Sequence, residues 1–104
     1  MFDTTRERTA LVARILESEG RASRAERRAA FDNAGLGPPL STLIDKVANR
    51  ADTITDSDIA SVKAAGLNED QIFELVVCAA VGEASRQYDA AVAALAAATV
   101  PGKE

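Results

Sequence analysis

Hydrophobic residues recur three and four residues apart along most of this chain, which is the spacing of the buried face of an α-helix. The first such stretch covers residues 3–19, with an apolar stripe made of Leu11, Val12, Ile15 and Leu16. Another begins directly behind the "GPP" at 37–39, with a stripe made of Leu40, Leu43, Ile44 and Val47. Each stripe predicts a helix that buries one side and leaves the other in water.

Capping signals predict where the helices begin and end. In three places a Ser, Thr or Asn is followed three residues later by an acid or Gln, the pattern of a capping box: Ser23 with Glu26, Thr55 with Asp58, and Asn68 with Gln71. Glycines at 20, 35 and 66 predict left-handed helix ends. Together these signals predict five helices: residues 3–19, a second that opens behind Ser23 and closes at Gly35, a third behind Pro39, a fourth from Thr55 to Gly66, and a long fifth at 69–98.

The fifth helix lacks a continuous polar face. Residues 75–81 are apolar all the way round, and the small residues Ala79, Ala80 and Gly82 permit another helix to approach closely. The tail "AAVAALAAA" at 90–98 has no strong polar face either. Because four short helices can scarcely enclose such a helix, we expect it to be buried against a second subunit.

Composition supports an all-α fold. Of the 104 residues 47% are hydrophobic, but the aromatic residues are only Phe2, Phe31, Phe73 and Tyr88. An alanine-rich, aromatic-poor chain packs helices closely and seldom builds a sheet. The length suits a single small domain, in which residues 1–36 form an N-terminal helical pair and residues 37–104 form the helical core with the long C-terminal helix.

Charge is distributed unevenly along the chain. Residues 1–30 hold seven arginines and five acids, a balance of +2, whereas residues 31–104 have a balance of −6. Solvated helix faces explain this pattern most simply, and head-to-tail docking of two chains is the alternative. The acidic total disfavours nucleic-acid binding, and the face made of Arg21, Arg24 and Arg28 has no aromatic residues interleaved with it.

The residue inventory argues against several kinds of site. There is no His, and a single Cys excludes an intrachain disulfide and a thiolate cage for a metal. Asp52, Asp56 and Asp58 alternate as in a Ca²⁺ loop but lack its turn glycine and closing Glu, and the last two suit the first turn of a helix. We therefore predict no metal and no cofactor.

No stretch of the sequence predicts a membrane segment or a secretory signal. The longest uninterrupted apolar stretch, residues 75–82, is too short to cross a bilayer. The start, "MFDTTRERT", lacks the apolar core of a signal peptide. We expect a soluble cytoplasmic protein.

Between about Arg24 and Leu95 the chain shows a distinctive order of features. It runs "AAFDNAGLGPPLSTLIDKVA", then a helix ending in "AAG", an apolar residue, a cap, "DQIFELV" and an alanine-rich helix that carries an Arg. In this order it resembles the carboxymuconolactone decarboxylase and alkylhydroperoxidase D superfamily over roughly two thirds of the chain. The resemblance implies an all-α fold whose subunits interlock into dimers, trimers or hexamers.

In the peroxidase branch the resemblance also implies a redox site: a Cys-x-x-Cys pair, a His four residues later, and an upstream Glu. The matching positions here are Ala51, Ile54 and Asp58, with Pro39 near the position of the Glu. The decarboxylase branch relies on residues that include a His, which this chain lacks. The expected fold is therefore carried over, whereas the active site of the family is not.

The remaining candidates for chemistry lie on the fifth helix. A relocated catalytic site would combine Cys78, Glu83, Arg86 and Tyr88, and a small acidic ligand would contact Glu74 and Arg86. The only charge within one turn of Cys78 is that of Glu74, which disfavours a reactive thiolate, so a structural Cys78 is favoured. Ion pairing with Glu83 or Asp89 is the simplest role for Arg86.

Two main hypotheses for function follow. The favoured one is a non-catalytic homo-oligomer, a dimer, trimer or hexamer, with a structural, binding or regulatory role. The alternative is an enzyme similar to alkylhydroperoxidases or decarboxylases, with its site relocated around Cys78 and Arg86. Nucleic-acid binding through the arginine-rich second helix is a distant third.

Overall fold

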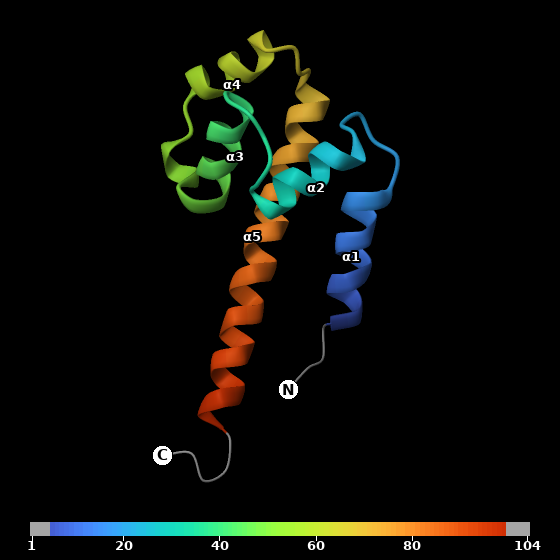
Figure 1. Cartoon of the computed structure of the whole chain (residues 1–104), viewed down its shortest axis with the longest axis vertical. Helices are drawn as coiled ribbons and strands as arrows, with labels where there is room; N and C mark the ends of the chain where they lie inside the picture. Colours follow the sequence, from blue (N-terminus) through green and yellow to red (C-terminus); the bar gives the residue numbers. More distant parts are fainter. Residues whose placement is uncertain (1–4, 100–104) are drawn as a thin grey trace.

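The computed structural model describes residues 5–99, which form α-helices joined by short turns (Figure 1). The α-helices are α1 (Thr5–Glu17), α2 (Arg24–Asp32), α3 (Leu40–Asn49), α4 (Asp56–Ala64) and α5 (Glu69–Ala98), and a short 3-10 helix, η1 (Ala51–Thr53), joins α3 to α4. Residues 5–99 contain no strand. The predicted all-α fold with five helices is confirmed. Residues 3 and 4 of the first predicted helix lie outside the described residues.

Helix α5 is the axis around which the other helices are arranged (Figure 1). Helices α2, α3 and α4 lie around the first half of α5. Helix α1 runs beside α5 on the side away from α3 and α4, and the last turns of α5 extend beyond all the other helices. The molecule is correspondingly elongated, 57 Å by 29 Å by 20 Å. The core lies where the short helices meet the first half of α5, and its largest fully buried side chains are Leu43, Ile44, Leu75, Val62 and Cys78. No helix within residues 5–99 is both long enough and apolar enough to span a membrane.

All three predicted capping boxes are present. Each cap side chain accepts a hydrogen bond from the backbone N–H three residues later, and the side chain at that later position accepts one from the backbone N–H of the cap residue, at Ser23, Thr55 and Asn68. Each box satisfies backbone donors that a helix start leaves without partners. The starts of α2, α4 and α5 therefore follow directly from the sequence.

The helix ends follow the predictions less closely. Gly66 has a φ of 112° and ends the turn after α4 as expected. The left-handed residue directly after α2 is Asn33, with a φ of 51°, and Gly35 adopts a positive φ two residues later. Gly20 does not adopt a positive φ, so its predicted role is wrong. Its small size matters instead, because a Cβ there would lie 2.5 Å from an oxygen of Glu74.

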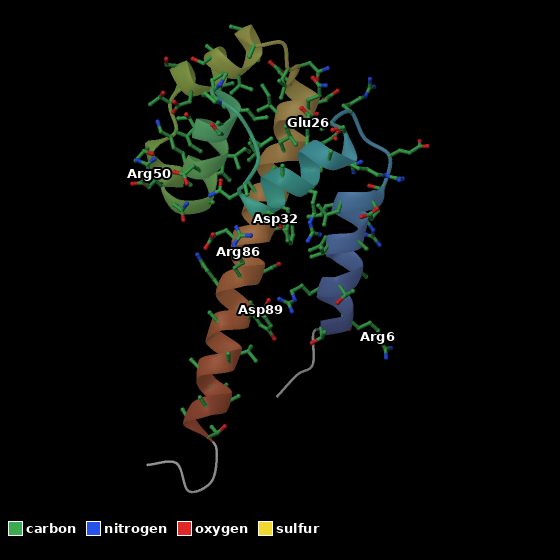
Figure 2. The ribbon with its side chains drawn as sticks, in the orientation of Figure 1. Arg6, Glu26, Asp32, Arg50, Arg86 and Asp89 are labelled. Atoms are coloured by element: carbon green, nitrogen blue, oxygen red, sulfur yellow. The ribbon has the colours of Figure 1, made fainter. Side chains whose placement is uncertain are left out.

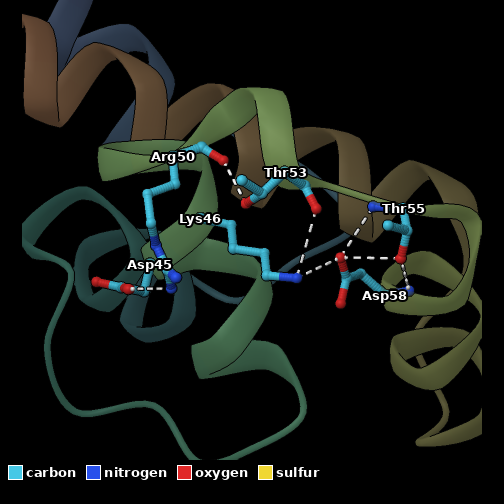
Figure 3. Close-up of polar contacts among 6 residues, drawn as sticks. All are labelled: Asp45, Lys46, Arg50, Thr53, Thr55 and Asp58. Atoms are coloured by element: carbon cyan, nitrogen blue, oxygen red, sulfur yellow. Dashed lines mark hydrogen bonds and ion pairs between the residues drawn. The ribbon is translucent and has the colours of Figure 1, made fainter.

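A lysine and an aspartate hold the corner between α3 and α4 (Figure 3). Lys46 Nζ lies 2.9 Å from Asp58 Oδ2 and 3.5 Å from the carbonyl oxygen of Thr53. The same Asp58 oxygen accepts a hydrogen bond from the backbone N–H of Thr55. Lys46 and the Thr55 N–H together lower the pKa of Asp58. One carboxylate thus caps α4 and attaches it to α3.

The closest approach of two helices is that of α2 to α5. The end of α2 lies directly on Gly82, where a Cβ would overlap the carbonyl oxygen of Phe31 and lie 2.8 Å from its carbonyl carbon. The contact is possible because glycine has no side chain. Gly82, which the sequence suggested as a contact point for a second subunit, therefore contacts a helix of its own chain.

The middle of α5 is more enclosed than the sequence predicted. Leu75, Cys78 and Ala79 are buried by the chain itself, and only Ala80 of residues 75–81 is exposed. The expectation that the short helices cannot cover this stretch is wrong, because α2 and α3 pack closely against it. Most of the exposed apolar residues of α5 lie further along, between Tyr88 and residue 98, although Phe73 near its start is exposed as well.

Gly82→Ala tests the close approach of α2 and α5. In an ordinary helix interior this change would stabilise by up to about 1 kcal/mol. Here we expect a loss of about 1–3 kcal/mol of unfolding free energy, because the methyl group must displace the backbone of Phe31. The measurement is urea denaturation, with the exposed Ala84→Gly as a control that should cost about 1 kcal/mol. A stabilised Gly82→Ala protein would contradict the packing described.

Candidate functional site

Of the candidate residues on α5, three line cavities, and these cavities are separate; Glu83 and Tyr88 line neither of them. Cys78 and Glu74 line the first, of about 260 Å³, together with residues of α1 and α2. Arg86 and Asp89 line the second, of about 270 Å³, which lies further along α5 and beside α1. The structure therefore does not bring Cys78 and Arg86 into one cavity.

Cys78 is a buried thiol on the wall of the first cavity. Its side chain is on the inner face of α5, the residue is 1% exposed, and Sγ lies 3.8 Å from the carbonyl oxygen of Ile15. Burial raises the pKa of the Cys78 thiol, Glu74 adds to the increase, and Arg27 opposes it. The thiol is therefore protonated at neutral pH, which makes it a poor nucleophile.

Glu74 links α5 to the turn before α2. Its carboxylate accepts hydrogen bonds from the backbone N–H groups of Arg21, at 2.8 Å, and Ala22, at 3.0 Å. Burial alone would raise the pKa of Glu74, but these two donors, with the charges of Arg27 and Arg21, lower it overall. The carboxylate thus attaches α5 to the turn before α2 and places a negative charge near the start of that helix, where it is favourable.

Arg27 is the residue of the first cavity that the sequence analysis missed. It is 4% exposed, and its Nη1 donates to the carbonyl oxygen of Ile15 at 3.1 Å. Its Nε has no hydrogen-bond partner among the described residues. The available signal was periodicity, because Arg27 lies one turn before the buried Ala30, off the face of the exposed Arg24 and Arg28. Arg21, which the sequence placed on that same face, lies in the turn before α2.

Arg86 holds the end of α2 in the same way that Glu74 holds its start. Its Nη1 donates to the carbonyl oxygen of Phe31 at 2.7 Å, and its Nη2 lies 3.2 Å from Glu83 Oε1. The predicted Glu83–Arg86 ion pair is confirmed. In Figure 2 Arg86 lies just below Asp32, beside the end of α2.

Asp89 pairs with α1 rather than with Arg86. Its carboxylate lies 2.6 Å from Nη1 of Arg8, and the Arg8 guanidinium lies over the ring of Tyr88, 5.0 Å from its centre. Figure 2 shows Asp89 on the side of α5 that faces α1. The candidate residues Glu83, Arg86 and Tyr88 therefore have structural partners within the chain.

The positions at which the family resemblance would place a redox site are elsewhere in the fold. Ala51 is in η1, Ile54 follows it, and Asp58 is in the first turn of α4, where it caps the helix and pairs with Lys46. Within the described part of the chain, no group of three or more Cys, Asp or Glu side chains is placed to hold a metal ion.

Comparison of the chain with protein-family models, with curated proteins and with solved structures finds no match. The resemblance to the carboxymuconolactone decarboxylase and alkylhydroperoxidase D superfamily therefore stays a prediction, and the site must be interpreted from its own geometry.

We predict that Cys78 is unreactive in the folded protein. A buried thiol with a raised pKa should react with a disulfide reagent such as Ellman's reagent only as the protein opens. Absorbance traces in buffer and in urea should show slow and fast reaction, respectively. Rapid stoichiometric reaction of the native protein at pH 7 would contradict the buried position.

Glu74 should contribute stability that is lost in acid. Because its folded pKa lies below the unfolded value of about 4.3, its contribution is complete above that value and disappears as the pH falls through the folded pKa. Glu74→Gln should therefore cost about 1–2 kcal/mol at pH 7, and the cost should shrink towards pH 3. Urea melts of both proteins at the two pH values measure this. The exposed Asp70→Asn is the control, and equal losses at both pH values for Glu74→Gln would argue against this contact with the turn before α2.

Proposed function

We propose that this chain is a non-catalytic helical module that works as a homo-oligomer, with the exposed end of α5 as the contact between copies. The observation that carries the proposal is the exposure of an apolar helix end. Residues 90–98 are alanine, valine and leucine throughout, every one is exposed, and no other described helix runs beside them (Figure 1).

The larger apolar residues of this helix end form one stripe. Tyr88, Val92 and Leu95 are three and four residues apart and therefore share a face, and they are 40%, 37% and 45% exposed. The stripe begins where Arg8 covers Tyr88 and continues past the start of α1. A helix from a second copy would extend the packing that α1 begins.

A second copy of the same chain suits this surface for two reasons. The alanines that flank the stripe permit a close approach of two helices, and an antiparallel pair of identical stripes is self-complementary, as a two-fold interface requires. The stretch 90–98 also has no charged side chain that a dimer would have to bury unpaired.

The polar residues of α5 support a structural role rather than catalysis. Glu74 accepts from the turn before α2, Glu83 and Arg86 pair with each other, and Asp89 pairs with Arg8. Cys78 has a raised pKa and the chain has no His to act as its base. A member of the resembled superfamily that has lost its redox residues would look like this, and this relationship is part of the proposal.

The enzyme alternative predicts turnover of peroxide with an external thiol as reductant. We expect no rate above that of the reductant alone, for the wild type and for Cys78→Ala alike. Turnover in the wild type that Cys78→Ala abolishes would overturn the non-catalytic assignment.

Self-association is tested with Leu95→Asp. At micromolar concentration the wild type should scatter light as more than one chain per particle, and Leu95→Asp should scatter as a monomer, because a buried unpaired carboxylate costs several kcal/mol. Ala90→Asp is the matched control: it adds the same charge on the opposite face of α5 and should leave the assembly intact. A monomeric wild type would contradict the proposal.

A further inference from the structure

We propose that the cavity beside Cys78 binds a small organic monoanion, a carboxylate with an apolar body, and that Arg27 is the residue that recognises it. The cavity lies within one chain, between α1, α2 and α5. The proposed site therefore does not depend on self-association through the end of α5.

Arg27 is a buried cation that forms no direct ion pair with a described residue, although its charge acts on Glu74 and lowers the pKa of that carboxyl. Arginine stays charged at any ordinary pH, and burial of an unpaired charge is costly. None of the ion pairs among residues 5–99 includes Arg27. Its bond to the carbonyl oxygen of Ile15 places it at the C-terminal end of α1, whose dipole supplies only about half a negative charge. The Nε–H, itself buried, has no partner among the described residues. An anion in the cavity that Arg27 lines would place a full negative charge beside the guanidinium.

The walls of the cavity indicate what kind of anion fits. Ile15, Phe73 and Val77 give it apolar sides, and Arg14 adds a second cation. The volume of about 260 Å³ lies just below the usual range for ligand sites, which begins at about 300 Å³, so the ligand must be small. Apolar walls around a buried guanidinium match a carboxylate that carries a short hydrocarbon or a ring.

Two acids of the wall restrict the charge of the ligand. Glu74 and Glu19 line the same cavity as the two arginines. The Glu74 carboxylate accepts from two backbone N–H groups and forms no direct ion pair with Arg27, and its charge repels a dianion. The site should therefore prefer a monocarboxylate over inorganic phosphate.

The test is titration of the ¹⁵N-labelled full chain with benzoate in a chloride-free buffer, followed by NMR. Benzoate should bind with a Kd of about 1 mM or lower and shift the signals of Ile15, Val77 and Cys78 more than those of Arg8 and Asp89. Benzamide, which has the same shape without the charge, and inorganic phosphate should each bind at least about tenfold more weakly. Equal binding of benzamide and benzoate, or no shift with about 10 mM benzoate, would overturn the proposal.

Variants separate Arg27 from general charge. Arg27→Met fills the same space without charge and should weaken benzoate binding by about tenfold or more, while it keeps or raises the melting temperature of the free protein. Arg28→Met removes an exposed arginine of the same helix and should leave binding unchanged. If Arg27→Met does not fold, the comparison of benzoate with benzamide in the wild type still decides the question. Unchanged binding in a folded Arg27→Met protein would exclude this role.

The monomeric Leu95→Asp protein provides an independent check. It should bind benzoate as the wild type does, because Leu95 lies far outside the cavity walls. Loss of binding in this variant would show that the site needs a second copy and would overturn the proposal of a site complete within one chain.

Discussion

The fold depends on one backbone contact, that of the Phe31 carbonyl group with Gly82. It brings the end of α2 against the middle of α5, at a separation that no residue with a side chain permits. The other short helices follow from this contact, since α1 is joined to α2 by a short turn and α3 follows it through the loop that Asn33 begins. A helix of nine residues has little stability of its own, so α2 forms because α5 holds it.

The charges of α5 reinforce the contact from both ends of α2. Glu74 accepts from the backbone N–H groups before the start of α2, and Arg86 donates to the carbonyl oxygen of Phe31 at its end. An acid at the start and a base at the end both complement the dipole of α2. Glu74 and Arg86, which the sequence offered as candidate site residues, thus hold α2 against α5. The exception is Arg27, a buried cation that forms no ion pair and whose Nε has no partner among the described residues.

The helix starts, which depend on residues close together in the chain, were predicted correctly. Ser23, Thr55 and Asn68 cap their helices as expected, because a capping box involves only four consecutive residues. The predictions failed where a feature depends on a contact between residues that are far apart in the chain. A Cβ at Gly20 would meet the side chain of Glu74, and a Cβ at Gly82 would meet the backbone of Phe31. Both contacts join residues far apart in the chain, so no local pattern predicts them. Arg27 was missed for the same reason. It stands between the exposed Arg24 and Arg28 in the sequence, and its burial depends on α1 and α5.

The central claim is that α2 and α5 form a single cooperative unit, and native-state hydrogen exchange tests it most directly. The amides of α2, with those of Arg21 and Ala22 before it, should open with the same free energy as the amides around Leu75 and Ala79, because α2 leaves the structure only when the middle of α5 opens. Exchange of the α2 amides at a much lower opening free energy, with α5 still protected, would contradict this account.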